Sequence, residues 1–544
     1  MESRRDVEHR FDVPPGVMLP DLAQAEGIAA VSTPRESHHH ATYYDTDDLR
    51  LASHHITLRR RAGGEGPGWH LKVQLDNIRR TELWLPLDTG TTDIPEPLTR
   101  QVRAVALGHD LMPVAVVRTT RTERRLLNEN GDPVALLTDD NVHGERVGVV
   151  SARKAWRELE IELMDDDTAL LDSISARLES AGLRLSLSTS KLDRVLSDQL
   201  PRPATPRAPG GRRSAGQVVL AHLREQVDDL LFHDLAARRE LPDAVRRMRV
   251  ATRRLRSAFA NFRPLLDRRR AGELRGELSW LAAVLGGIRD VEMLVGRLRS
   301  LAEAQPDGLI VGPVRQRIDV TLGEAHARAH DDLRSALDGE RYPRLVDALE
   351  TLLAEPPLTA RAHRAATRVL PDLLASACRG VTATATAADN AVDREKHDHL
   401  LSEVRAAAER AWHAAESVTP VTGLTATRIG RRMRAVQEAL EEHRDSVVAR
   451  TMLWELGRNA RQAGDDGFTF GLLHGLERGR AESAERAYRR VIHSAVRRGW
   501  HREWPGGLSS PTEERRLALA VGVSRPGFAP SKPGSRSPDP IRDG

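Results

Sequence analysis

The residues best suited to chemistry in this 544-residue chain are charged side chains that recur at every second position of its first 200 residues. In a β-strand, residues i and i+2 point to the same face. Arg59 and Arg61 therefore form a basic row, and Glu158, Glu160 and Glu162 form an acidic row. Guanidinium groups suit phosphate oxygens, and carboxylates bind hard divalent cations. Together the rows indicate a site for phosphate and a metal ion.

A charged row is also what the wet face of an open antiparallel sheet presents to solvent. For any single row this plainer interpretation is the stronger one. Across the set it is weaker, because the two rows, Lys72 and Glu82 lie in consecutive strands with their signs segregated. The segregation favours charged residues that face a common interior.

The local pattern predicts that residues 1–200 form an α+β domain. Alternating segments bounded by Gly, Pro, Asn and Asp predict strands, at Ile56–Arg61, Trp69–Val73, Thr81–Leu85, Val114–Arg121, Val134–Thr138 and Glu158–Leu163. Three shorter stretches have helical patterns, at Asp21–Ala25, Pro97–Leu107 and Ala169–Ala181. If the charged rows share an interior, the strands form an antiparallel β-barrel.

A second charged feature is the predicted helix Val245–Phe262, which has one apolar and one basic face. The basic face carries Arg246, Arg249, Arg253 and Arg256. The surrounding segment 246–270 holds ten arginines against one acid. A solvated helix usually mixes signs for i,i+4 support, so this helix repels itself unless a polyanion binds it.

The basic helix belongs to an internal repeat. Arg249 precedes Asp290 by 41 residues, and Arg405 precedes Asp445 by 40, so two similar helical units lie about 155 residues apart. A repeat within an all-helical region predicts two pseudo-symmetric helical bundles joined across a basic cleft.

The amino-acid composition is typical of globular domains. The chain is 40% hydrophobic and 29% charged, and its net charge is only +4, so charge clustering is more informative than overall balance. Its lone cysteine, Cys378, excludes an intrachain disulfide framework. No membrane-spanning run or signal peptide is evident, which predicts a cytoplasmic protein. We expect a tunnel domain at 1–200, a Pro-rich linker at 201–215, a helical domain at 216–505 and a disordered tail at 506–544.

The order of motifs in residues 1–200 resembles the CYTH family of triphosphate tunnel metalloenzymes. The family opens with Glu-x-Glu-x-Lys, which here reads Asp6-Val-Glu8-His-Arg10. Further landmarks follow in order, at Tyr43–Thr46, Leu58–Arg61, Leu71-Lys72, Arg80–Glu82, Asp139-Asp140, Glu158–Glu162 and Ser190-Lys191.

The resemblance implies metal-dependent hydrolysis of inorganic triphosphate or a related triphosphate, with Mg²⁺ or Mn²⁺ as cofactor. It implies divalent-metal ligands at Asp6, Glu8, Glu158 and Glu160. It implies phosphate-binding residues at Arg10, Arg59, Arg61, Lys72 and Lys191. Glu82 would orient basic neighbours or a water, Arg121 would be a further phosphate contact, and Lys72 would act beside them in catalysis.

The helical region, approximately 216–504, resembles a CHAD domain, the conserved-histidine α-helical domain associated with polyphosphate binding. This resemblance implies that long-chain polyphosphate binds residues on both repeats, at Arg246, Arg249, Arg253, Arg256, Arg289, Arg405 and His443. Arg246 stands where the family carries His, and the second repeat has Ser402, Glu409 and Trp412 in place of His, Lys and Arg.

Three alternatives remain. Asp6 and Arg10 depart from the family pattern, which favours a non-catalytic polyphosphate-binding or granule-associated protein with a degenerate tunnel. A nucleotide cyclase would use the same tunnel but needs an adenine pocket, which no motif identifies. A nucleic-acid partner would use the arginines, but aromatic side chains for base stacking make up only 3% of the chain. The pattern leaves the oligomeric state open.

Overall fold

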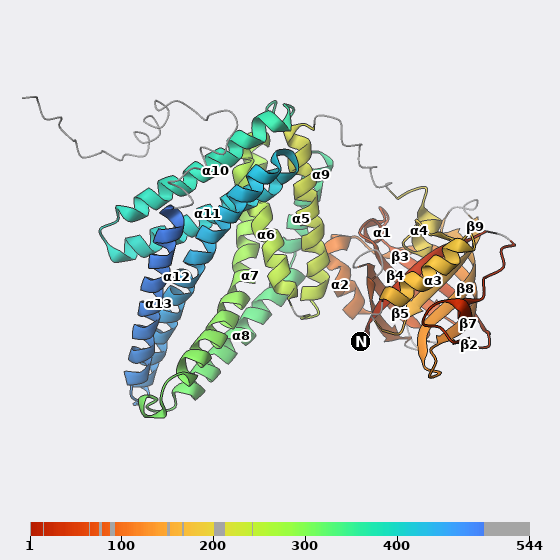
Figure 1. Ribbon diagram of the computed structural model, residues 1–544, viewed down its shortest axis with the longest axis horizontal. Coiled ribbons are helices and arrows are strands. Elements are labelled where there is room, and N and C mark those ends of the chain that lie inside the picture. Colours follow the sequence, from red (N-terminus) through yellow and green to blue (C-terminus); the bar gives the residue numbers. More distant parts are fainter. Residues whose placement is uncertain are drawn as a thin grey trace, which may run out of the picture.

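The computed structural model describes residues 2–14, 16–64, 66–74, 79–87, 93–148, 153–165, 168–200, 213–241 and 243–493, with side chains from residue 7 onward except at 79 and 80. Most of the expected linker and the whole expected tail lie outside the described residues. A strand-rich part and a helical part lie next to each other (Figure 1). The predicted fold class, an antiparallel β domain followed by an all-α domain, is confirmed.

The N-terminal domain is a closed antiparallel barrel. Its long strands are β1 (Glu2–Val13), β3 (Arg35–Asp45), β4 (Ile56–Ala62), β5 (Gly68–Gln74), β6 (Arg79–Pro86), β7 (Met112–Leu127), β8 (Pro133–Arg146) and β9 (Arg153–Leu163). They pair in the order β1-β6-β5-β4-β3-β7-β8-β9, and β9 returns to β1. The short strands β2 (Ala30–Val31) and β10 (Arg184–Leu185) pair with β7 and β1.

Strand β1 closes the barrel because its two halves have different neighbours. Residues 2–7 pair with β6, whereas residues 8–13 pair with β9. Closure gives the sheet an enclosed inner face. The alternating charged rows lie on that inner face, and the intervening apolar residues, such as Leu58 and Leu71, are buried on the outer face. The charged rows are therefore not the wet face of an open sheet.

Helices cover the outside and one end of the barrel. Outside it lie α1 (Arg50–Ser53), α2 (Glu96–Ala106) and α3 (Thr168–Ser180), with a 3₁₀ turn η1 (Leu22–Gln24). Helix α4 (Lys191–Leu196) closes one end, where Leu192 and Val195 pack against Val117 and Val142. The α2 and α3 helices occupy two of the stretches with predicted helical patterns, and η1 occupies the third. Ile174 and Leu178 of α3 pack with Phe11 and Ile161, which seals the outer face of β1 and β9.

The described part of the C-terminal domain contains two runs of four helices separated by α9 (Arg341–Ala354). The first run is α5 (Ala215–Ala237), α6 (Ala244–Asn261), α7 (Arg268–Glu303) and α8 (Val314–Asp338), with 3₁₀ turns η2 (Arg263–Leu265) and η3 (Asp307–Leu309). The second run is α10 (Ala366–Asp389), α11 (Arg394–Thr422), α12 (Leu424–Gln462) and α13 (Phe468–Ile492). Consecutive helices pack within each run, and α6 also packs on α11.

One apolar core joins the two domains. Leu98 and Val102 of α2 lie in the same buried cluster as Leu58 of β4 and Leu230 of α5. Figure 1 shows α2 between the barrel and the helices. At the polar edge, Glu350 of α9 forms ion pairs with Arg50 and His54, on and just after α1. The barrel and the helical domain therefore pack as one body.

This shared core predicts that Leu98→Ala destabilises both domains. Leu98 is fully buried, and deleting a buried leucine side chain lowers the free energy of unfolding by about 2–5 kcal/mol. In differential scanning calorimetry, the unfolding transitions of the barrel and the helical domain should shift to lower temperature together. Leu187→Ala, at a fully exposed leucine, is the control and should change neither. A loss confined to one domain would contradict a shared core.

Candidate functional site: a charged tunnel and an arginine cluster

The barrel encloses a cavity of about 230 Å³ that brings together most of the predicted tunnel residues. Strands β1, β3, β4, β5, β6, β7 and β9 and helix α4 all contribute to its lining. From the prediction, the lining includes Glu8, Arg10, Arg59, Arg61, Lys72, Glu82, Arg121, Glu160 and Lys191. Asp6 lies on β1 opposite Arg80, but its side chain is outside the described part.

Three carboxylates form one end of the site. Asp140, Glu158 and Glu160 each offer an oxygen, and these oxygens lie within 4.8 Å of one another. Asp140 and Glu158 are almost completely buried. Several oxygen ligands in a small volume are the donor set that Mg²⁺ and Mn²⁺ prefer, so the residues present fit a divalent cation. Asp140 was missed as a ligand, although it belongs to a quoted landmark.

Each of these carboxylates is paired with a buried cation. Arg10 donates from Nε to Glu160 at 2.8 Å, and Arg121 donates to Asp140 at 2.7 and 2.8 Å. Lys191 Nζ lies 2.8 Å from Asp140 and 2.7 Å from Glu158. Ser190 caps α4, so Lys191 is held at the first position of that helix. Predicted metal ligands and predicted phosphate ligands therefore neutralise one another.

Ion pairing has a larger effect than burial on the pKa of Glu160 and Asp140. Burial by itself would raise the pKa of Glu160, but Lys191, Arg10 and Arg121 hold that pKa well below its ordinary value. Burial would likewise raise the pKa of Asp140, but Lys191 and Arg121 lower it below its ordinary value. Both carboxylates are consequently ionised at neutral pH.

The opposite wall is basic and contains a single central carboxylate among its described residues. Glu82 lies 3.3 Å from Lys72 and 3.8 Å from Arg59 and accepts from His70 at 2.7 Å. Burial opposes ionisation of Glu82, yet Lys72 and His70 lower its pKa. Burial and the neighbouring charge of Arg59 lower the pKa of Arg61 to about 10. Such mutual repulsion among cations favours an anion between them.

Three histidines and a tyrosine of the tunnel were given no role by the sequence analysis. His39, His55 and His70 line the cavity, and Tyr43 accepts a hydrogen bond from Arg59 at 3.4 Å. Burial and the charges of Arg121 and Arg61 lower the pKa of His39 to about 4. The signal was present in the strand period, because His70 and Lys72 share a face.

The helical domain holds a second group of cations, where α6 packs on α11. Burial and neighbouring Arg253 lower the pKa of Arg249 to about 10. Burial is also the main cause of the lowered pKa of Arg256 and Arg410. Arg405 contributes a repelling charge to Arg256 from the second repeat. We call Arg249, Arg253, Arg256, Arg405 and Arg410 the arginine cluster.

Carboxylates intrude on this cluster. Glu409 is buried and pairs with Arg253, and Glu441 lies 3.2 Å from Arg405. These acids come from the second repeat, where the sequence departs from the CHAD pattern. The two halves therefore contribute unequal positive charge to the cluster, as the substitutions at the second repeat predict.

The remaining predicted polyphosphate residues have other surroundings. Arg246 is exposed and pairs with Asp243 at the start of α6. His443 is buried with its Nε2 3.4 Å from Asp398. Arg289 lies on α7 and contributes positive charge near Asp445.

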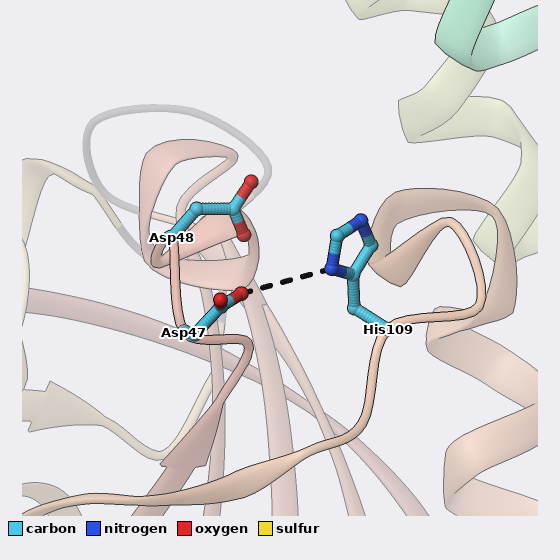
Figure 2. Close-up of side chains that lie close together, drawn as sticks. All are labelled: Asp47, Asp48 and His109. Carbon is cyan, nitrogen blue, oxygen red and sulfur yellow. Dashed lines mark ion pairs between the residues drawn. The ribbon is translucent and has the colours of Figure 1, made fainter.

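An exposed group outside the tunnel joins two loops of the barrel. Asp47 and Asp48 follow β3, and His109 follows α2. Figure 2 shows His109 pointing toward the two aspartates, and its Nδ1 lies 3.6 Å from Asp47 Oδ1. All three side chains are open to solvent. The pair ties the loops together as a surface contact.

Comparison with known proteins agrees with this geometry. The CYTH domain model matches residues 4–195, and the CHAD domain model matches residues 221–454. An uncharacterised protein of Mycobacterium tuberculosis is 34% identical over 512 residues, covering 91% of this chain and 96% of the relative. The chain belongs to the CYTH–CHAD family. Within the described part, no helix is long and apolar enough to cross a membrane.

Solved structures resemble parts of this CYTH–CHAD protein. PptA from Streptomyces chartreusis is 25% identical, with a TM-score of 0.45, covering 52% of this chain and 99% of that one. The CHAD domain of Ricinus communis is 21% identical, with a TM-score of 0.38, covering 58% and 93%.

The tunnel electrostatics predict that Glu82→Gln destabilises the CYTH domain in a pH-dependent way. Removing one partner of a buried ion pair costs about 3 kcal/mol of unfolding free energy at pH 7. Because the pKa of Glu82 is lowered in the folded state, its contribution is complete above about pH 4.3, the ordinary carboxylate value, and declines as pH falls below it.

The measurement is denaturant unfolding of both proteins at pH 7, 4 and 3. The difference between wild type and Glu82→Gln should shrink as the pH is lowered. Glu129→Gln, at an exposed loop position, is the matched control and should show no difference. An equal Glu82 effect at every pH would contradict the assigned charge state.

Proposed function

We propose that the CYTH domain hydrolyses inorganic triphosphate or a related triphosphate with Mg²⁺ or Mn²⁺, and that the CHAD domain binds polyphosphate. One observation carries the first half: one cavity is lined by Glu160 and by a basic wall with Arg59, Arg61 and Lys72, and the carboxylates of Asp140 and Glu158 lie directly beside Glu160. A metal ion and a phosphate chain are the complementary ligands of such a cavity.

Within this proposal Glu8, Asp140, Glu158 and Glu160 would hold the divalent cation. A bound cation would supply charge neutralisation on phosphate oxygens and activation of a water. Hydrolysis of a phosphoanhydride depends mainly on positioning and on electrostatic stabilisation, so the protein needs no covalent nucleophile. The tunnel lining meets that requirement with rigid, preorganised cations on barrel strands.

The remaining tunnel groups would divide the work between them. Arg59, Arg61 and Lys72 would bind the phosphates at the basic wall, while Arg10, Arg121 and Lys191 would bind those nearest the carboxylates. Glu82 fixes the positions of Lys72 and His70, because its two oxygens contact both. The chain of phosphates would thus lie between two sets of cations, with water held at the carboxylate end.

A non-catalytic tunnel is the second candidate, and the contacts of Arg10 favour it. Arg10 lies within 3.5 Å of oxygens of Glu8, Glu158 and Glu160. A metal ion that binds these carboxylates must therefore displace a guanidinium group. If the displacement is too costly, the tunnel binds polyphosphate without turning it over.

Phosphate release from tripolyphosphate with Mg²⁺ or Mn²⁺ tests the tunnel. Wild-type protein should turn over tripolyphosphate only with a divalent metal, and Glu160→Gln should lower kcat/KM by about 100-fold or more, because a charged ligand is lost in a buried site. Asp132→Asn, in an exposed turn, should be unaffected. Tripolyphosphate binding without turnover under either metal would select the non-catalytic candidate.

Opposite substitutions in the CHAD domain test polyphosphate binding. Arg249→Ala combined with Arg256→Ala should weaken affinity and reduce the salt dependence of log K by about 2, one for each lost phosphate contact. Glu409→Gln should strengthen affinity, because it frees Arg253 from its buried partner. Long-chain polyphosphate titrations at several salt concentrations measure both changes. The control is Arg299→Ala, at an exposed arginine of α7; equal affinity in all variants would exclude the cluster.

A further inference from the structure

His70 occupies an unusual position in the tunnel. It lies on β5, two residues before Lys72, and only 4% of its surface is exposed. Its Nδ1 is 2.7 Å from Glu82 Oε1, and its Nε2 is 3.2 Å from the carbonyl oxygen of Gly66. The same carbonyl accepts from Arg61 at 2.9 Å. His70 thus connects the loop after β4 to the central carboxylate of the basic wall.

Both partners of His70 are hydrogen-bond acceptors. An ionised carboxylate and a backbone carbonyl have no proton to donate, and a neutral imidazole has only one N–H. With Nδ1–H donated to Glu82, a neutral His70 presents a lone pair to the Gly66 oxygen. Only the doubly protonated ring satisfies both contacts. The geometry of the site therefore matches the imidazolium form.

The surrounding charges oppose that form. Burial, together with Arg59 and Arg61 on β4, lowers the pKa of His70, and Glu82 on β6 only partly compensates. A triphosphate bound at Arg59 and Arg61 would add negative charge beside the two groups that repel a proton from His70. Triphosphate binding would then offset the repulsion from Arg59 and Arg61, while Glu82 and the Gly66 carbonyl stay in place as acceptors.

We propose that His70 is a proton-linked positioning residue, which takes up one proton at Nε2 when a triphosphate binds and then holds Glu82 and the Gly66 loop together. This inference rests on the proposed triphosphate function of the tunnel. Triphosphate then binds the protonated form of His70 more tightly than the neutral form. The affinity for triphosphate therefore falls as the pH rises through the pKa of His70 in the complex.

Calorimetric titration with imidotriphosphate and Mg²⁺ tests the proposal without turnover, because NH groups replace the bridging oxygens. Titrations at pH 7.5 in buffers of different ionisation enthalpy give the number of protons taken up. His70→Asn retains an N–H near the Nδ1 position but cannot be protonated. We expect wild type to take up more protons than this variant, by a difference approaching one.

A second variant separates proton uptake from simple packing. His70→Gln places its amide near the Nε2 position, so it reaches Gly66 but loses the bond to Glu82. Losing a hydrogen bond to a charged group weakens binding by about 10- to 100-fold, so affinity should fall further in His70→Gln than in His70→Asn. The pH dependence of affinity should be flatter in both variants than in wild type.

The outcomes are distinguishable. Equal proton uptake in wild type and both variants, with binding intact, would overturn the role of His70 and leave the proposed function standing. Failure of wild type to bind imidotriphosphate would overturn the proposed function and this inference together. Thermal unfolding of each variant shows whether a lost signal reflects a folded protein.

Discussion

The pairing of opposite charges inside a closed barrel is the constraint on which the tunnel depends. Unpaired ions in such an interior would cost several kcal/mol each. The barrel interior avoids this by pairing Arg10, Arg121 and Lys191 with Asp140, Glu158 and Glu160. The same contacts keep Asp140 and Glu160 ionised and hold the side chains in fixed positions. Charge neutrality and preorganisation thus have one origin.

In the proposed function, that constraint also links metal and phosphate binding. A divalent cation at the carboxylates would compete with guanidinium and ammonium groups, whereas phosphate oxygens would compete with the carboxylates for those groups. The two ligands would therefore bind to different members of the same ion pairs. The basic wall differs, because there one carboxylate, that of Glu82, lies near both Arg59 and Lys72.

Packing connects this chemistry to the helical domain. Strand β4, which carries Arg59 and Arg61, begins directly after α1, and the contacts of Arg50 and His54 with Glu350 lie at that junction. The apolar core continues from the outer face of β4 through α2 into α5. The arginine cluster lies beyond, where α6 meets α11. The tunnel and the arginine cluster therefore belong to one packed body.

The sequence by itself determined the local structure and most of the site. Period-two alternation located β4, β5 and β9 and put Arg59 with Arg61 and Glu158 with Glu160, because strand geometry fixes side-chain direction. Only the tertiary structure decided which acidic and basic side chains form ion pairs. Barrel closure by β1 brought Arg10 onto Glu160, and helix packing brought Glu409 onto Arg253. The two acceptors around His70 also depend on a strand register and a loop conformation, which no local pattern specifies.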